Sequence, residues 1–197
     1  MISNDGRRVM TQAGRSRLIG CTRWAELSGS VLFLAELSDS FEVISEFRLV
    51  NGADPAIVGL EADGSLGFLR EALAESPAGP TPLCAHIQAV VSNIEAIADV
   101  LRERGQRAVV VIATDGESTD GDVAQALRPL VHLPVLVIVR LCTEESAILD
   151  YWNGIDQQLE LDVDVLDDQL GDARQVAAAN PCLTYAEPLH RLRAALA

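Results

Sequence analysis

Two short runs of apolar, mostly β-branched residues constrain the fold more than any other feature of the chain. They occupy positions 108–113 (AVVVIA) and 134–139 (PVLVIV). Continuous runs of this length, bounded by turn residues, are typical of parallel strands that are covered on both faces. The segment between them, 122–130, has a helical composition, so the sequence predicts a strand–helix–strand unit.

Periodicity predicts the other elements. The clearest predicted helix spans 83–104, where apolar residues recur at spacings of three and four along one stripe. Further helices are predicted at 24–37, 66–74, 146–158, 172–179 and 188–196. Short strands are predicted at 47–50, 56–60 and 159–166, the first two joined through a turn that contains Asn51-Gly52. The predicted fold class is therefore α/β, with a doubly wound, mostly parallel sheet flanked by helices.

The charged residues exclude several classes of protein. The chain has 29 acidic and 15 basic residues, a formal net charge of −14, and every basic residue is Arg. Without Lys it cannot form a Walker A loop, a pyridoxal Schiff base or a protein-kinase core. The acidic excess also argues against a nucleic-acid partner. Residues 1–23 carry five Arg and one Asp, so we expect a basic arm over 1–23 and the main domain over 24–197.

The sequence also indicates where the protein works. No amino-terminal apolar segment resembles a signal peptide, and no uninterrupted apolar run approaches the roughly 18 residues of a membrane span. The four cysteines lie far apart and form no C-x-x-C pair. We therefore expect a cytoplasmic protein with free thiols and no membrane partner.

The loop at 114–122, which follows the first buried run, is the strongest candidate site. It holds four carboxylates in eight residues, namely Asp115, Glu117, Asp120 and Asp122. In open α/β sheets ligands bind beyond the carboxyl ends of the strands, and oxygen ligands suit Mg²⁺, Mn²⁺ or Ca²⁺. The loop is not an EF-hand, because the tight turn of that motif needs Gly where Asp120 stands. The alternative is a polar loop in which Asp122 caps the next helix.

Two segments of the sequence together resemble a known family. The segment 109–116 (VVVIATDG), with Thr81-Pro82-Leu83 ahead of the long helix, is similar to the von Willebrand factor type A (VWA) domain over roughly residues 24–165. The resemblance implies a metal-ion-dependent adhesion site for Mg²⁺ or Mn²⁺, completed by an acidic side chain of a protein partner. It implies that Thr81 approaches the metal through its hydroxyl and that Asp115 acts directly or through a water.

The family's remaining metal loop, Asp-x-Ser-x-Ser after the first strand, has a degenerate counterpart here. In the register Asp5-Gly6-Arg7-Arg8-Val9-Met10, Asp5 keeps the carboxylate but Arg7 and Val9 replace the two serines. Arg only donates and Val offers no oxygen, so the guanidinium of Arg7 would satisfy the carboxylates in place of an ion. This register leaves a very short first strand and predicts a long loop at 11–22.

Two other segments have the look of that loop. The segment 26–30 (ELSGS) falls inside the helix predicted at 24–37, and 36–40 (ELSDS) would require that helix to be a strand. The sequence is compatible with three functions. They are a VWA-like protein-binding module with or without a divalent cation, a metal-free scaffold of the same fold, and a Mg²⁺-dependent hydrolase.

The hydrolase is the weakest of these hypotheses, because the sequence shows no complete catalytic constellation. Ser65 only nearly matches the G-x-S-x-G pattern, and His86, His132 and His190 have no partner motif. Arg140, at the end of the second apolar run, is expected to emerge beside Asp115. We therefore expect a binding protein rather than an enzyme.

Overall fold

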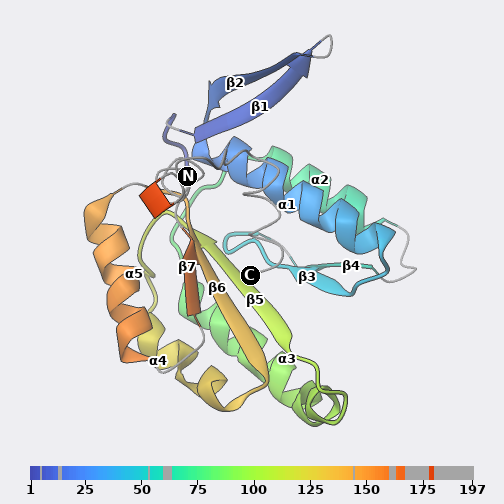
Figure 1. Ribbon diagram of the computed structural model, residues 1–197, viewed down its shortest axis with the longest axis vertical. Helices are drawn as coiled ribbons and strands as arrows, with labels where there is room; N and C mark the ends of the chain where they lie inside the picture. Colours follow the sequence, from blue (N-terminus) through green and yellow to red (C-terminus); the bar gives the residue numbers. More distant parts are fainter. Residues whose placement is uncertain are drawn as a thin grey trace. The chain divides into compact units, whose positions relative to one another are not determined.

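The computed structural model describes residues 1–4, 6–12, 15–52, 54–59, 64–143, 145–159, 163–166 and 178–179. The protein is a mixed α/β structure (Figure 1). Its chain divides into two compact units, unit 1 at Met1–Pro80 and unit 2 at Thr81–Ala197. The boundary expected after residue 23 stays a prediction.

Unit 1 begins with a β-hairpin. Strands β1 (Gly6–Gln12) and β2 (Arg15–Cys21) pair antiparallel, from Gly6 opposite Cys21 to Gln12 opposite Arg15. The prediction of a long loop at 11–22 is therefore wrong. Continuous backbone pairing between two seven-residue strands outweighs the low strand preference of their Gly, Ser and Arg residues. A Cβ at Gly6 would lie 2.6 Å from the carbonyl oxygen of Thr22, so only glycine fits at the start of β1.

Helix α1 (Arg23–Ser40) confirms and extends the helix predicted at 24–37. Thr22 caps it, because its hydroxyl accepts the N–H of Ala25 at 3.1 Å. Both serine-rich segments of α1 are helical, and the Ser30 hydroxyl donates to the carbonyl of Glu26 at 3.3 Å. The alternative that turned 36–40 into a metal loop after a strand is therefore wrong.

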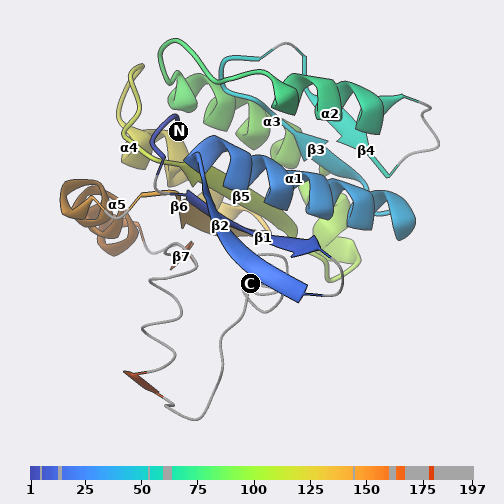
Figure 2. The same ribbon diagram turned by 90° about the horizontal axis from the view of Figure 1, so that it is seen from above.

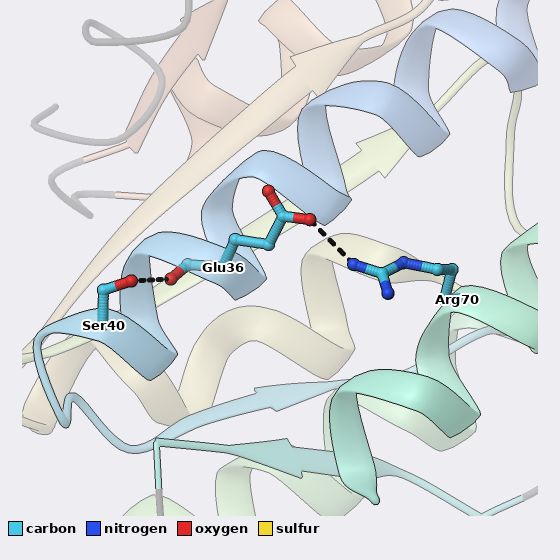
Figure 3. Close-up of polar contacts among 3 residues, drawn as sticks. All are labelled: Glu36, Ser40 and Arg70. Atoms are coloured by element: carbon cyan, nitrogen blue, oxygen red, sulfur yellow. Dashed lines mark hydrogen bonds and ion pairs between the residues drawn. The ribbon is translucent and has the colours of Figure 1, made fainter.

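Helix α2 (Ser65–Ala74) and the antiparallel pair β3 (Ser45–Phe47) and β4 (Ala56–Val58) complete unit 1. The helix and the hairpin were predicted, although β3 begins before the predicted 47–50. The Trp24 indole N–H donates to the carbonyl of Leu73 at 3.1 Å. Arg70 of α2 donates to Glu36 of α1 at 2.8 Å, and Figure 3 shows the two side chains pointing toward each other. The buried core of the unit consists of Ala35, Ala56, Val58, Leu69 and Leu73.

Unit 2 contains a three-stranded parallel sheet. Its strands are β5 (Ala108–Thr114), β6 (Val135–Leu141) and β7 (Val163–Leu166), in the order β5-β6-β7 (Figure 1). This confirms the two apolar runs as parallel neighbours and places a strand within the predicted 159–166. The connections are α4 (Val123–Leu127) with the 3₁₀ helix η1 (Arg128–His132), and then α5 (Ser146–Gln158).

The main hydrophobic cluster of unit 2 lies on one face of this sheet. Ile112 of β5 and Val137 and Val139 of β6 join one buried cluster with residues of α3 (Leu83–Glu103), α4 and α5. Figure 2, seen from above, shows α3 and α4 on the same side of β5 and β6. On the other face Val109 is 59% exposed and Val111 45%. The prediction of cover on both faces is therefore confirmed for β6, where Ile138 on the Val111 side is 1% exposed, and wrong for β5, where the described helices of unit 2 pack on the Ile112 side.

Helix α3 confirms the clearest sequence prediction. By length and composition it is the one helix in the described part of the chain that could cross a membrane. Its apolar stripe is buried within the protein. The predicted helices at 172–179 and 188–196 lie outside the described residues, except that 178–179 are helical. The buried stripe of α3 comprises Leu83, Cys84, Ile87, Val91, Ile94 and Ala98.

Candidate functional site

The candidate site is the edge of unit 2 where β5 and β6 end. β5 ends at Thr114, and the following loop folds back at once, because the Thr114 hydroxyl donates to the Gly116 carbonyl at 3.1 Å and accepts the Gly116 N–H at 3.2 Å. The next strand along is tied in here too, since the N–H of Cys142 donates to the Thr114 carbonyl at 2.8 Å. These hydrogen bonds thus fix the start of the loop at this edge of the sheet.

The second half of the loop, Ser118-Thr119-Asp120, binds the start of α3. The hydroxyl of Thr119 accepts the N–H of Thr81 at 2.9 Å, and the N–H of Thr119 donates to the Thr81 carbonyl at 2.9 Å. Asp120 accepts the N–H groups of Cys84 and Ala85, both at 2.9 Å. We call this set of contacts the α3 clasp.

The α3 clasp supplies a cap that the helix itself lacks. The residue before α3 is Pro82, which makes no side-chain capping bond. The first N–H groups of a helix have no partner within the helix, and a carboxylate there also complements the helix dipole. Asp120 supplies this cap from the loop after β5, a different segment of the chain. No sequence pattern identified it, although a long helix preceded by Pro was a sign that the cap had to come from elsewhere.

The electrostatics of the clasp follow from these bonds. The Ser118 hydroxyl donates to Asp120 at 2.6 Å. That bond, followed by the N–H groups of Ala85 and Cys84, lowers the pKa of Asp120 to about 2. Cys84 lies against the same group with its thiol 3.4 Å from the Ser118 hydroxyl. Burial, together with the nearby Asp120 and Asp122 charges, raises the pKa of the Cys84 thiol above 9.0.

The last carboxylate of the loop caps a different helix. Asp122 accepts the N–H of Ala124 at 2.9 Å and that of Gln125 at 3.3 Å, at the start of α4. This confirms the capping alternative for Asp122. Two of the four loop carboxylates, Asp120 and Asp122, are therefore engaged as helix caps.

Aromatic residues of α5 lie beneath the first half of the loop. Trp152, 1% exposed, donates its indole N–H to the Gly116 carbonyl at 3.3 Å. Tyr151 packs edge-on against Trp152, with ring centroids 5.6 Å apart. Burial, reinforced by the negative charges of Glu117 and Asp122, raises the pKa of the Tyr151 hydroxyl. Trp152 thus contacts the loop directly, and Tyr151 lies close enough to feel the charges of Glu117 and Asp122.

The structure joins Thr81 to the loop that contains Asp115. Thr81 and Asp115 are both half-buried in unit 2, and Thr81 is bonded to the loop that Asp115 begins. Arg140 lies in β6 opposite Ala113 and is 5% exposed.

The third metal loop does not have the expected form. Asp5 lies outside the described residues, and Arg7 and Val9 belong to strand β1 of unit 1. Met1–Asn4 form no strand ahead of them. In the part of the chain that the structure describes, no three His, Cys, Asp or Glu side chains converge as metal ligands.

Comparison with known proteins gives no relative for this chain. No protein-family model matches it, and neither a curated protein nor a solved structure does.

Proposed function

We propose that the chain is a VWA-like protein-binding module with a doubly wound fold. It recognises a protein partner through the carboxyl-end edge of unit 2, which comprises Thr81, the 114–122 loop and Cys142-Thr143 after β6. The observation that carries the proposal is the pair of hydrogen bonds between Thr81 and Thr119. They hold the start of the long helix against the loop after the buried strand, where ligands of open α/β sheets bind.

The parallel order β5-β6-β7, with α4 and α5 as connections, supports the same proposal, because it corresponds to one half of a doubly wound sheet. We further infer a cytoplasmic setting. The described cysteines, Cys21, Cys84 and Cys142, form no disulfide, as is usual in a reducing compartment.

A divalent cation fits this edge only in part. Mg²⁺ and Mn²⁺ prefer several oxygen ligands. Here Asp120 and Asp122 are already engaged as helix caps. Binding of Mg²⁺ or Mn²⁺ at Thr81 and Asp115 would therefore need a further oxygen, such as that of an acidic side chain of the partner. The proposed binding function does not depend on the ion.

An affinity experiment tests the proposal. The full chain, immobilised as bait, is compared with the site variant Thr81→Val/Asp115→Asn and with the control variant Ser92→Ala/Asp99→Asn on the exposed face of α3. We expect a partner to be retained by the wild type and the control and lost from the site variant. The same proteins on all three baits would overturn the proposal.

Thermal unfolding with Mg²⁺ or Mn²⁺ against a chelator tests the ion separately. A ligand of the native state at 100 times its Kd stabilises by about 2.7 kcal/mol, which raises Tm. A Tm rise that Asp115→Asn abolishes would support a cation site at this edge. An unchanged Tm at millimolar ion would leave the metal-free scaffold.

A further inference from the structure

The middle of the loop after β5 contains no hydrophobic residue. Residues 117–120, with the sequence ESTD, lie between Gly116 and Gly121, and we call this segment the strap. Of its four residues Ser118 is half-buried and the others are exposed. Local opening of a protein is easiest where a segment makes few buried apolar contacts and its hydrogen bonds face solvent. The composition and exposure of the strap fit that description.

Both ends of the strap are fixed, and a glycine stands at each end. The Gly116 carbonyl accepts the indole N–H of Trp152 at 3.3 Å, and Asp122, which follows Gly121, caps α4. Gly121 has a φ of +151°, which glycine adopts far more readily than other residues. At Gly116 a Cβ would meet nothing within 4 Å, so close packing does not require a glycine there. Hinges are a few residues that absorb changes of backbone angle, and these two glycines are placed for that role.

The middle of the strap is held to the start of α3 by the hydrogen bonds of the α3 clasp. Those that the N–H groups of Thr81 and Ala85 donate are solvent-exposed. The Ser118 hydroxyl donates to Asp120 at 2.6 Å and so keeps the capping carboxylate in place. Water can replace the partners of exposed hydrogen bonds at a small net cost. Opening of the strap therefore mainly exchanges polar contacts for contacts with water.

The strap covers a thiol. Cys84 lies in the first turn of α3 and is 5% exposed. Its Sγ lies 3.4 Å from the Ser118 hydroxyl oxygen, and a Cβ at Gly121 would lie 3.5 Å from the same sulfur. The segment from Ser118 to Gly121 thus packs against Cys84, and a strap that moves away leaves this thiol open to solvent.

We propose that the strap opens locally, with Gly116 and Gly121 as hinges, and uncovers Cys84 together with the first turn of α3. The closed strap shields the thiol and caps the helix. The open strap leaves the thiol, and the N–H groups of Cys84 and Ala85, to water. The sheet stays folded in both forms, because the bond between Thr114 and Cys142 lies outside the strap. A few hydrogen bonds thus control access to one thiol.

Opening of the strap also changes the edge through which we propose that a partner binds. It separates Thr119 from Thr81, whose two hydrogen bonds carry that proposal. The closed strap is then the form that binds the partner. This last step rests on the proposed function, whereas the opening itself does not.

Alkylation of Cys84 by iodoacetamide at pH 8, followed by peptide mass spectrometry, measures the opening. Ser118→Ala removes the bond to Asp120 and should raise the labelling rate of Cys84 about three- to tenfold. Burial raises the pKa of the Cys84 thiol and the Ser118 hydrogen bond lowers it, so loss of that bond alone would slow the reaction. Faster labelling therefore requires opening. Ser92→Ala is the matched control, because the Ser92 hydroxyl donates to the Gln88 carbonyl within α3, and its rate should equal that of the wild type.

Urea separates local opening from global unfolding. A local opening exposes little surface, so the labelling rate of Cys84 should change little with urea below the unfolding transition. Hydrogen exchange gives a second measure of the same event. In Ser118→Ala the N–H groups of Cys84 and Ala85 should exchange faster by about the same factor as the thiol reacts, and those of β5 should exchange as in the wild type. Gly116→Ala restricts the open strap and should slow labelling about two- to fivefold.

Three outcomes would overturn the proposal, with far-UV circular dichroism as the check that each variant is folded. A Cys84 labelling rate in Ser118→Ala at or below that of the wild type would show that the strap does not control access to the thiol. A rate that rises with urea as steeply as global unfolding would exclude a local opening. Labelling of Gly116→Ala as fast as the wild type would exclude Gly116 as a hinge. None of these results bears on the proposed binding function, which is tested with a partner rather than with a thiol reagent.

Discussion

The carboxylate of Asp120 accepts the backbone N–H of Cys84 at 2.9 Å, although the two residues are 36 positions apart in the sequence. This bond connects the loop after β5 to the first turn of α3. The loop was predicted to bind an ion, but its second half mainly holds the end of β5 to the start of α3. Any partner or ion at this edge would meet a surface whose backbone is already fixed.

The first prediction concerns the acid stability that Asp120 provides. Its pKa is lowered from 3.8 to about 2 in the folded protein. A carboxyl group whose pKa falls on folding stabilises the native state above its unfolded pKa, and this contribution is lost as the pH falls through the folded pKa. Asp120→Asn should therefore lower Tm at pH 7 by roughly 2–4 °C, and the difference from wild type should vanish between about pH 4 and pH 2.

Asp99→Asn is the control for this experiment. Asp99 also lies on α3, but its side chain is 94% exposed and forms an ion pair with Arg102, three residues later. The control should change Tm little at any pH, because exposed ion pairs contribute little. Equal pH profiles for Asp120→Asn and wild type would show that the cap contributes nothing to stability.

A second prediction contrasts two glycines of unit 1. Gly59 has a φ of +85°, and a Cβ there would lie 2.1 Å from the carbonyl oxygen of Val43. Gly67 lies in helix α2, where a Cβ would meet nothing within 4 Å. Gly59→Ala should destabilise unit 1 by about 2 kcal/mol or more, whereas Gly67→Ala should stabilise it by roughly 0.5–1 kcal/mol.

Urea unfolding, monitored by circular dichroism, measures both changes. The opposite signs make the pair informative, because a general intolerance of unit 1 to substitution would lower the stability of both variants. A neutral Gly59→Ala would mean that the backbone near Val43 can move away without cost.

A third prediction uses the Cys84 thiol. Burial is the largest cause that raises its pKa above 9.0. The thiolate is the reactive form, so Cys84 should react with iodoacetamide more slowly than Cys21 or Cys142, which are half-buried. Mass spectrometry of peptides after timed alkylation at pH 8 would give the order. Labelling of Cys84 at the rate of the other two would show that the start of α3 opens readily.

The elements that could be predicted from sequence are those with a local pattern. The β-branched runs of β5 and β6 and the apolar stripe of α3 carry their periodicity within the segment itself, and these elements were predicted to within one or two residues. The β1–β2 hairpin was missed because Arg, Ser and Gly residues hide its alternation. Its stability comes from pairing between strands, which a single segment does not encode.

In the candidate site, too, the local features could be predicted from sequence and the contacts between distant segments could not. Asp122 caps α4, which begins at the next residue, and this local role was among the alternatives. The contact of Asp120 with Cys84 joins segments distant in sequence, so no spacing rule could have shown it. The exposed face of β5 was missed for a similar reason. The composition of a strand predicts burial, but which helices cover each of its faces depends on tertiary packing.

The last prediction compares the two tryptophans, one in each unit. Trp152→Phe removes the indole N–H that donates to the Gly116 carbonyl and leaves space where a side chain is 1% exposed. It should destabilise unit 2 by about 1–3 kcal/mol. Trp24→Phe removes the bond to the Leu73 carbonyl and should destabilise unit 1 by about 1 kcal/mol.

Each variant leaves one tryptophan, whose fluorescence reports the unit that was not changed. In Trp24→Phe, Trp152 should report a unit 2 that unfolds at the wild-type urea midpoint, and Trp152→Phe should give the converse. If both midpoints fall together in either variant, the two units unfold as one cooperative structure. Independent midpoints would establish unit 2, with its capped loop, as a separate folding unit.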